Sequence, residues 1–192
     1  IDNCSSIKII GRGGVGMDNI DVEYARKKGI KVINTPAASS HSVAELVFAH
    51  LFGMARFLHE SNRNMPLEGD SRFKDLKKSY AKGTELRGKT LGVIGFGRIG
   101  QATAKIALGL GMNVVAYDPY IDAVNLELEF FDHQAVFFTI NTITKEEVLK
   151  QSDFISLHVP AQNEYVISKN DFDLMKDGTC IVNAARGGVI DE

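Results

Sequence analysis

The chain has 192 residues, of which 44% are hydrophobic and 24% are charged, and this composition is typical of a globular chain with a sizeable core. Its formal net charge of −2 excludes the basic excess that nucleic-acid-binding and membrane-surface proteins carry. No apolar run approaches the roughly 18 residues of a membrane span, and two cysteines are too few for a disulfide framework, so we expect a cytoplasmic protein.

The first elements alternate between strand and helix. Residues 7–10 and 31–33 are short apolar runs that predict strands, and residues 22–28 between them have helical spacing. A strand, a helix and a second strand in this order are typical of parallel α/β architecture.

A long helix is predicted over residues 42–60, where apolar side chains fill most of the circumference. A helix of this kind is buried on several sides. The pattern favours a subunit interface, and the alternative is a central helix in the core of a monomer. The polar residues 62–83 that follow predict an irregular surface segment.

The rest of the chain continues the alternation. A strand at 90–94, a helix at 98–110 and a strand at 113–117 form a β-α-β unit. No element is predicted for residues 121–143, which hold four phenylalanines and are longer than one loop needs. A helix, a strand, a helix and a strand are then predicted at 145–151, 154–159, 171–175 and 179–183.

A glycine motif lies at the first turn of this β-α-β unit. Gly95, Gly97 and Gly100 have the spacing G-x-G-x-x-G between a buried strand and a helix, and Asp118 ends the second strand. Glycines at this spacing allow a tight turn, a close approach of a pyrophosphate and close packing of helix on strand. A carboxylate at Asp118 can bind the ribose hydroxyls and repels a 2′-phosphate, which favours NAD over NADP.

The same spacing also occurs at residues 11–16, but there it is not convincing. Asp18 and Asp21 follow it where a phosphate-binding helix should begin, and their charges would repel a pyrophosphate. No acid ends the next strand. We therefore interpret this segment as a turn beside an active site.

Two further residues follow predicted strands. Arg186 can clamp a carboxylate and polarise a carbonyl, or it is an exposed arginine in a surface ion pair. His158 can line the same pocket, although a structural histidine is the favoured interpretation. The histidines do not have the spacing of a metal site, and none is assigned as the general base.

Taken together, these motifs resemble the NAD-dependent D-2-hydroxyacid dehydrogenases. The resemblance rests on residues 91–100 and on Tyr117-Asp118-Pro119, His158-Val159-Pro160 and Asn183-Ala184-Ala185-Arg186-Gly187-Gly188, in the order that the family has them. It covers nearly the whole chain and is strongest toward the D-3-phosphoglycerate dehydrogenases. The segment between Tyr120 and Thr144 is longer than the family's usual connection.

The resemblance implies an α/β fold with a Rossmann-type doubly wound parallel sheet, preceded by the tail of a flavodoxin-like substrate domain. Residues 1–33 would be that tail, and residues 34–192 would be the NAD-binding domain, truncated at its C-terminal end. The helix at 42–60 would build a homodimer. Arg186 would be catalytic, and the implied cofactor-binding residues are Val15, Gly95, Gly97, Arg98, Ile99, Gly100, Asp118, Pro119, His158, Val159, Pro160, Ala184, Ala185 and Arg186.

The implied reaction is the oxidation of 3-phosphoglycerate to 3-phosphohydroxypyruvate, a step of serine biosynthesis. Glycerate and hydroxypyruvate are the alternative substrate pair, and an NAD-sensing corepressor is the alternative class of protein. The family's other catalytic groups, a Glu and a His, follow the arginine, and no histidine of this sequence matches that position. We therefore expect a piece of a longer protein that binds NAD without turnover.

Overall fold

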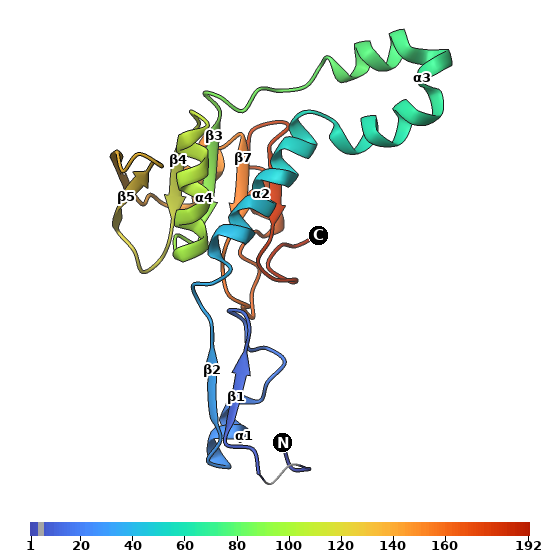
Figure 1. Ribbon diagram of the computed structural model, residues 1–192. Helices are drawn as coiled ribbons and strands as arrows, with labels where there is room; N and C mark the ends of the chain where they lie inside the picture. The colour runs from blue at the N-terminus through green and yellow to red at the C-terminus, as the bar shows by residue number, and fades with distance from the viewer. Residues whose placement is uncertain (4–5) are drawn as a thin grey trace. The chain divides into compact units, whose positions relative to one another are not determined.

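A computed structural model describes residues 1–3 and 6–192, and these residues form two compact units, Ile1–Ser42 and Val43–Glu192. The first unit contains β1 (Ile9–Arg12), α1 (Val22–Lys27) and β2 (Lys31–Asn34), and its two strands are parallel (Figure 1). The predicted strand, helix and strand are confirmed, with the first strand two residues later in the chain than expected.

The local sequence explains where α1 begins and ends. Asp21 caps its N-terminus by accepting a 2.9 Å hydrogen bond from the backbone N–H of Tyr24, and basic residues occupy its last turn. Gly29, with a φ of +75°, then turns the chain toward β2. Ala25 is the fully buried residue of the helix, so α1 contributes only a small apolar contact.

A four-stranded parallel sheet forms the centre of the second unit. Its strands are β3 (Thr90–Ile94), β4 (Asn113–Tyr117), β7 (Phe154–Leu157) and β8 (Cys180–Asn183), in the order β4-β3-β7-β8. The chain therefore adds β4 on one side of β3 and then returns to add β7 on the other side. This is the Rossmann-type arrangement that the sequence predicted. The strand predicted at 154–159 is shorter than expected and ends at Leu157.

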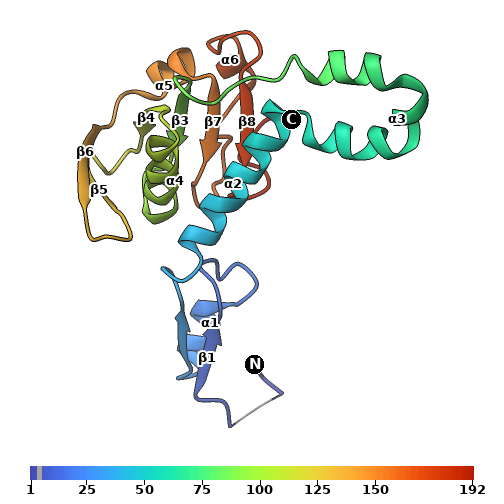
Figure 2. The same ribbon diagram turned by 45° about the horizontal axis from the view of Figure 1, so that its top comes forward.

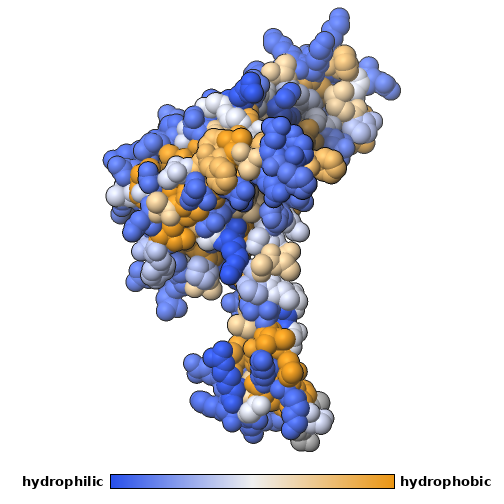
Figure 3. Space-filling view, turned by 60° about the vertical axis from the view of Figure 1, so that its left-hand side comes forward, coloured by the Kyte–Doolittle hydropathy of each residue, from blue (hydrophilic) through white to orange (hydrophobic). Residues whose placement is uncertain are grey.

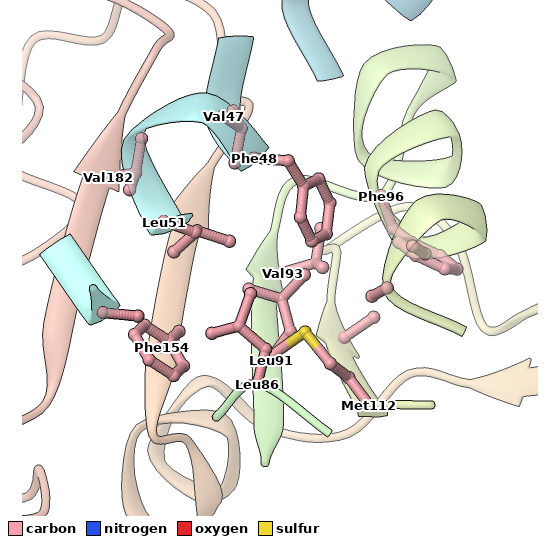
Figure 4. Close-up of a cluster of buried hydrophobic side chains, with 14 of the residues drawn as sticks. Val47, Phe48, Leu51, Leu86, Leu91, Val93, Phe96, Met112, Phe154 and Val182 are labelled. Atoms are coloured by element: carbon pink, nitrogen blue, oxygen red, sulfur yellow. The ribbon is translucent and has the colours of Figure 1, made fainter. Parts of the chain in front are cut away.

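Helices cover both faces of this sheet (Figures 1 and 2). On one face, α2 (Ser40–Ala55) and α4 (Arg98–Gly109) pack against Leu91 and Val93, which point to the same side of β3 (Figure 4). Ile94 points to the other face, where α5 (Lys145–Gln151) covers it and α6 (Lys169–Phe172) follows. Burial on both faces explains why the strands are almost continuously apolar.

The prediction of one helix over 42–60 and an irregular segment over 62–83 is wrong. The first helix, α2, ends at Ala55, and Phe57 adopts a left-handed conformation with a φ of 53°. A second helix, α3 (Leu58–Tyr80), then runs outward with one non-helical residue at Arg72. Leu76 is the one residue of α3 that is buried, so its sequence is polar enough to resemble a surface loop.

The base of α3 is held closed by contacts between its two ends. The backbone N–H of Thr84 donates a 2.7 Å hydrogen bond to the carbonyl of Ala55. The rings of Phe57 and Tyr80 lie 6.3 Å apart, centre to centre. The segment that begins at Phe57 therefore returns to its starting point before it enters β3.

The segment without a prediction, 121–143, forms an antiparallel hairpin of β5 (Ala123–Glu129) and β6 (Ala135–Asn141). Leu126 of β5 is buried and packs with the cluster that α4 covers. Thr142 closes the stem, because its backbone N–H donates to the carbonyl of Asp122 at 2.8 Å and because it pairs in parallel with Ala116 of β4. The extra length is therefore a folded element that leaves and rejoins the edge of the sheet.

Two smaller expectations also change. The helix predicted at 171–175 is observed slightly earlier, as α6. Cys180, expected to be buried, is partly exposed, and Cys4 lies outside the described residues. Among the described residues, no helix is long and apolar enough to cross a membrane.

Candidate functional site

The carboxyl ends of the four parallel strands bring most of the predicted site residues to one edge. Gly95 follows β3, Asp118 follows β4, His158 follows β7 and Ala184 follows β8. The order of the strands reverses between β3 and β7, and ligands of open α/β sheets bind at such a point. The structure thus collects in one place residues that are up to 91 positions apart in the sequence, from Gly95 to Arg186.

The glycine turn after β3 leaves no room for side chains at its first and third glycines. A Cβ atom at Gly95 would lie 2.7 Å from the carbonyl oxygen of His158, and Gly95 itself has a φ of +91°. A Cβ atom at Gly100 would lie 2.2 Å from the carbonyl oxygen of Gly95. Because both neighbours are backbone atoms, these two positions need glycine for packing alone.

The second glycine has the opposite surroundings. Gly97 is exposed, and a Cβ atom there would meet nothing within 4 Å. It is the N-cap of α4 and provides no side-chain hydrogen bond, so no side chain of the cap residue occupies the first amide groups of the helix. Arg98, which follows, is also exposed. This arrangement fits a pyrophosphate, since the helix N-terminus provides N–H donors and a positive partial charge.

Asp118 stands beside this turn. Its Oδ2 atom accepts a 2.8 Å hydrogen bond from the backbone N–H of Phe96, and its Oδ1 atom accepts a 2.9 Å bond from Tyr120. The side chain stays partly exposed, so each oxygen retains capacity to accept a further bond from a hydroxyl. Pro119 and Tyr120, both exposed, provide no cation for a 2′-phosphate, which fits NAD.

His158 is held inside the site edge rather than presented to a ligand. Its Nε2 atom lies 2.9 Å from the hydroxyl of buried Ser156, and its backbone N–H donates to the carbonyl of Ile94 at 2.8 Å. Burial lowers the pKa of His158 from 6.5 to about 4, so the ring is neutral at pH 7. The buried Nδ1 atom has no hydrogen-bond partner among the described residues. These contacts favour the structural interpretation of this histidine. Val159 and Pro160 continue the same edge.

The loop after β8 carries Arg186. The side chain of Asn183 accepts a 3.0 Å hydrogen bond from the N–H of Ala185 and donates a 2.7 Å bond to the carbonyl of Arg186. The guanidinium of Arg186 is only partly exposed and donates to the carbonyl of Ala185 at 2.9 Å. The loop therefore has a fixed shape that holds an arginine at the edge of the sheet.

Val15 lies in the first unit, in the loop that follows its glycine-rich segment. Asn34 donates a 2.8 Å hydrogen bond from its side chain to the carbonyl of Val15, and Thr35 bonds Gly14 through both its hydroxyl and its backbone. The glycine-rich segment before Val15 leads into a loop, and α1 begins only at Val22. Its geometry therefore differs from that of a phosphate-binding turn, in line with the sequence analysis.

Sequence reasoning did not assign three residues that shape the site. Ser156 binds the ring of His158, Asn183 holds the arginine loop, and Gln101 donates a 2.9 Å hydrogen bond to the carbonyl of Phe96 in the glycine turn. Asn183 carried a detectable signal, since Asn at a strand end commonly bonds the backbone two residues on. No pattern in the sequence indicates the roles of Ser156 and Gln101 before the fold is known.

The family model that matches this chain is that of the D-isomer specific 2-hydroxyacid dehydrogenase, NAD binding domain, over residues 48–192. The chain belongs to this family. The match confirms the family resemblance and NAD as the cofactor of the domain. The glycine turn, its open helix N-terminus and Asp118 are the features of the structure that fit this cofactor.

Among similar proteins is a hydroxypyruvate reductase from Thermotoga maritima, 46% identical over 100% of this chain and 58% of its own length. A D-3-phosphoglycerate dehydrogenase from Methanocaldococcus jannaschii is 44% identical over 100% of this chain and 34% of its own length. The solved structure of D-2-hydroxyisocaproate dehydrogenase is 33% identical, with a TM-score of 0.76 over 96% of this chain and 52% of that chain. The chain thus spans about a third to three fifths of the length of these relatives.

Proposed function

We propose that the protein takes part in the NAD-dependent oxidation of a D-2-hydroxy acid, with 3-phosphoglycerate as the favoured substrate. The observation that carries the proposal is the position of the Arg186 loop, at the same sheet edge as the glycine turn and Asp118. A dinucleotide that reaches across this edge from the turn has its reactive end on the β7–β8 side, where a carboxylate-binding arginine is needed.

In this proposal the residues of the chain divide into two groups. Gly95, Gly97, Arg98, Ile99 and Gly100 hold the pyrophosphate, and the adenosine and nicotinamide contacts come from Val15, Asp118, Pro119, Val159, Pro160, Ala184 and Ala185. His158 supports the same edge from within and makes no contact with the cofactor. Arg186 binds the substrate carboxylate and polarises the carbonyl that forms. A bound NAD would supply the acceptor for the hydride of the hydroxyl-bearing carbon, and the hydroxyl proton would go to a general base.

We further propose that the 192 residues bind NAD and that turnover belongs to a longer protein. The share of each relative that the chain covers, 58% and 34%, supports this. Residues 1–33 would then be the tail of the substrate domain and residues 34–192 the cofactor domain. The structure divides into two compact units between Ser42 and Val43, and this supports two domains, with a boundary somewhat later in the chain than the proposed one. The protein would act in the cytoplasm.

The test is a steady-state assay of the full-length protein with NAD and D-3-phosphoglycerate, followed through NADH formation. We expect turnover in the intact protein. An Arg186→Lys variant keeps the charge and loses the planar fork, so it should raise KM and lower kcat. The proposal fails if no D-2-hydroxy acid supports NAD reduction.

Glycerate and hydroxypyruvate are the second candidate pair. The identity to the Thermotoga hydroxypyruvate reductase, 46%, is slightly above that to the Methanocaldococcus D-3-phosphoglycerate dehydrogenase, 44%. Assaying D-glycerate beside D-3-phosphoglycerate separates the two. A larger kcat/KM for D-glycerate would select the second candidate.

We also propose that the protein is a homodimer through α2 and α3. Several large apolar side chains on these helices are exposed, among them Leu46, Phe52, Leu58, Leu67 and Phe73. A cleft of about 280 Å³ also opens at the base of α3, lined in part by Met54 and Phe57. A polar helix with one buried residue gains little from its own chain, so a partner's surface would stabilise it.

Sedimentation velocity tests the dimer. Leu58→Glu combined with Leu67→Glu should convert the dimer to a monomer, because each substitution places a carboxylate in an apolar contact. Phe131→Glu, at a fully exposed position on the β5–β6 hairpin, is the control and should leave the dimer intact. A wild-type protein that sediments as a monomer would contradict the proposal.

A further inference from the structure

The β5–β6 hairpin has two different faces. Val124, Leu126 and Ile140 alternate onto the face that packs against the core cluster. On the other face, Glu127 of β5 stands directly opposite Phe137 of β6. The inner face alone accounts for the attachment of the hairpin, so the outer face and the tip are free for another role.

The tip and outer face expose aromatic rings that lie outside the buried clusters of the described residues. Phe131 is fully exposed, and Phe137 and Phe130 are 59% and 52% exposed. None of the three belongs to a buried cluster. Figure 3 turns this side of the molecule forward and shows hydrophobic residues gathered at the surface among hydrophilic ones. Several exposed rings on one small element are typical of an interaction site, whereas a single ring is not.

The hairpin carries acidic side chains without basic ones to balance them. Residues 121–143 contain Asp122, Glu127, Glu129 and Asp132 and no lysine or arginine. The one histidine, His133, lies 3.5 Å from Glu129 and is exposed. The surface therefore combines aromatic rings with uncompensated carboxylates, and it complements a partner that is both apolar and basic.

One strand edge of the hairpin is open. Among residues 1–3 and 6–192, β5 pairs with β6 and with no other strand. No strand of the described residues thus pairs with its other edge, and an extended peptide that joins a sheet adds to an edge of this kind. Strand addition would place alternate side chains of the peptide beside Glu127 and Glu129.

The position of the hairpin separates it from the surfaces already discussed. In both ribbon views it lies on the β4 side of the sheet, whereas α2 covers the β7–β8 side and α3 leaves from there (Figures 1 and 2). A partner on the hairpin can therefore bind while α2 and α3 are engaged. Pairing of two β5 edges from two copies is disfavoured, because it would bring four glutamates together.

We propose that the β5–β6 hairpin is a docking site for an extended, basic segment of another protein. The segment adds as a strand to the free edge of β5. Its lysine or arginine side chains stand on the outer face, where their charged groups pair with Glu127 and Glu129 and their aliphatic stems lie toward Phe137 and Phe131. Its apolar side chains point to the inner face, on the side of Val124 and Leu126. The sequence of such a segment alternates basic and apolar residues.

The test uses the 192-residue chain and three labelled heptapeptides with valine at alternate positions and Lys, Gln or Glu at the others. Fluorescence anisotropy should show that the Lys peptide binds at least ten-fold more tightly than the Gln and Glu peptides. Hydrogen exchange should show added protection in β5. Equal binding of the three peptides, or protection elsewhere in the chain, overturns the proposal.

Two variants locate the binding. Glu127→Lys with Glu129→Lys should reverse the preference in favour of the Glu peptide. Glu60→Lys with Glu85→Lys makes the same change in net charge at other exposed positions and should leave the preference unchanged. The same effect in both variants would show that the peptide preference depends on net charge alone, and this would overturn the proposal.

The aromatic part is tested separately. Phe131→Ser with Phe137→Thr should weaken the Lys peptide about ten-fold and change thermal unfolding little, because Phe131 is fully exposed and Phe137, 59% exposed, belongs to no buried cluster. Two further measurements ask whether another occupant uses the surface: self-association of the wild-type chain, and its binding to phosphatidylcholine vesicles. If either occurs and the variant abolishes it, the surface belongs to that occupant and the proposal is overturned.

Discussion

The Oδ2 atom of Asp118 accepts a 2.8 Å hydrogen bond from the backbone N–H of Phe96. This bond joins the end of β4 to the middle of the glycine turn that follows β3. It sets the carboxylate beside the N-terminus of α4, where it is partly exposed. The acid that is expected to bind the ribose therefore also fixes the shape of the turn that is expected to bind the pyrophosphate.

Asp118→Asn tests this double role. The amide can still accept a hydrogen bond from Phe96, but it loses the charge that strengthens bonds to hydroxyls and repels a 2′-phosphate. We expect NAD affinity to fall about ten-fold, which corresponds to about 1.4 kcal/mol, and the preference for NAD over NADP to shrink. Isothermal titration with both nucleotides measures this. Asp122→Asn, at an exposed position nearby, is the control, and an unchanged NAD/NADP ratio in Asp118→Asn would contradict the expectation.

The glycine turn offers a matched pair of variants. Gly100→Ala would place a Cβ atom 2.2 Å from a backbone oxygen, so we expect it to lower the free energy of unfolding by about 1–3 kcal/mol. Gly97→Ala meets open space at a φ of −72° and should cost less than about 1 kcal/mol. Its methyl group would nevertheless obstruct the pyrophosphate, so NAD affinity should fall at least about ten-fold. Urea unfolding and NAD titration separate the two effects, and tight NAD binding by Gly97→Ala would place the nucleotide elsewhere.

His158 should make the stability of the second unit depend on pH. Burial lowers its pKa to about 4, whereas an unfolded chain takes up the proton near pH 6.5. Protons therefore favour the unfolded state between these values, so stability is full above pH 6.5 and falls as the pH drops toward 4. The loss amounts to roughly 3 kcal/mol.

A His158→Leu variant removes this titration. The difference in unfolding free energy between wild type and variant should change over pH 6.5 to 4 and be flat above it. Measuring both proteins by urea unfolding at several pH values cancels the contribution of the carboxylates. A difference that stays constant over the whole range would show that the histidine is exposed.

The ion pair of Lys145 and Asp171 should stabilise the second face of the sheet. The Nζ atom of Lys145 lies 2.9 Å from the carboxylate of Asp171, which is nearly buried and also accepts bonds from the N–H and hydroxyl of Ser168. Burial by itself raises the pKa of Asp171, but the bonds from Ser168 and Lys145 outweigh it, and the pKa lies below its usual 3.8. The contribution is therefore complete above about pH 4 and is lost as the pH falls through the lowered pKa.

Asp171→Asn leaves the lysine without its counter-charge and should lower stability by about 2–4 kcal/mol. Adding Lys145→Met should recover part of the loss, because the partly buried charge is then removed as well. Thermal unfolding of the single and double variants at pH 7 measures the coupling. Purely additive effects would show that the two side chains do not interact.

The sequence predicted the elements that bury apolar residues on a regular period. The predictions of β3, β4 and the helix between them were correct. Leu91, Val93 and Ile94 form a short apolar run that is typical of a strand buried on both faces. The glycine spacing then identified the turn. The candidate residues at the other strand ends followed from the rule that parallel strands place their carboxyl ends at one edge.

Two elements were missed for different physical reasons. The helix α3 contains Pro66 and is polar, with Leu76 as its one buried residue, so neither propensity nor period revealed it. The hairpin did carry a signal, since Val124, Leu126 and Leu128 alternate with polar residues along β5. The turn was obscured because its left-handed position, with a φ of 62°, is occupied by His133 and not by a glycine.

The stem at Thr142 has a consequence for protein engineering. Because Asp122 and Thr142 are bonded to each other, the ends of the segment between them stay together whatever lies in the middle. A fluorescent reporter inserted at Asp132, or new chain termini placed there, would therefore put little strain on the fold of the NAD-binding domain.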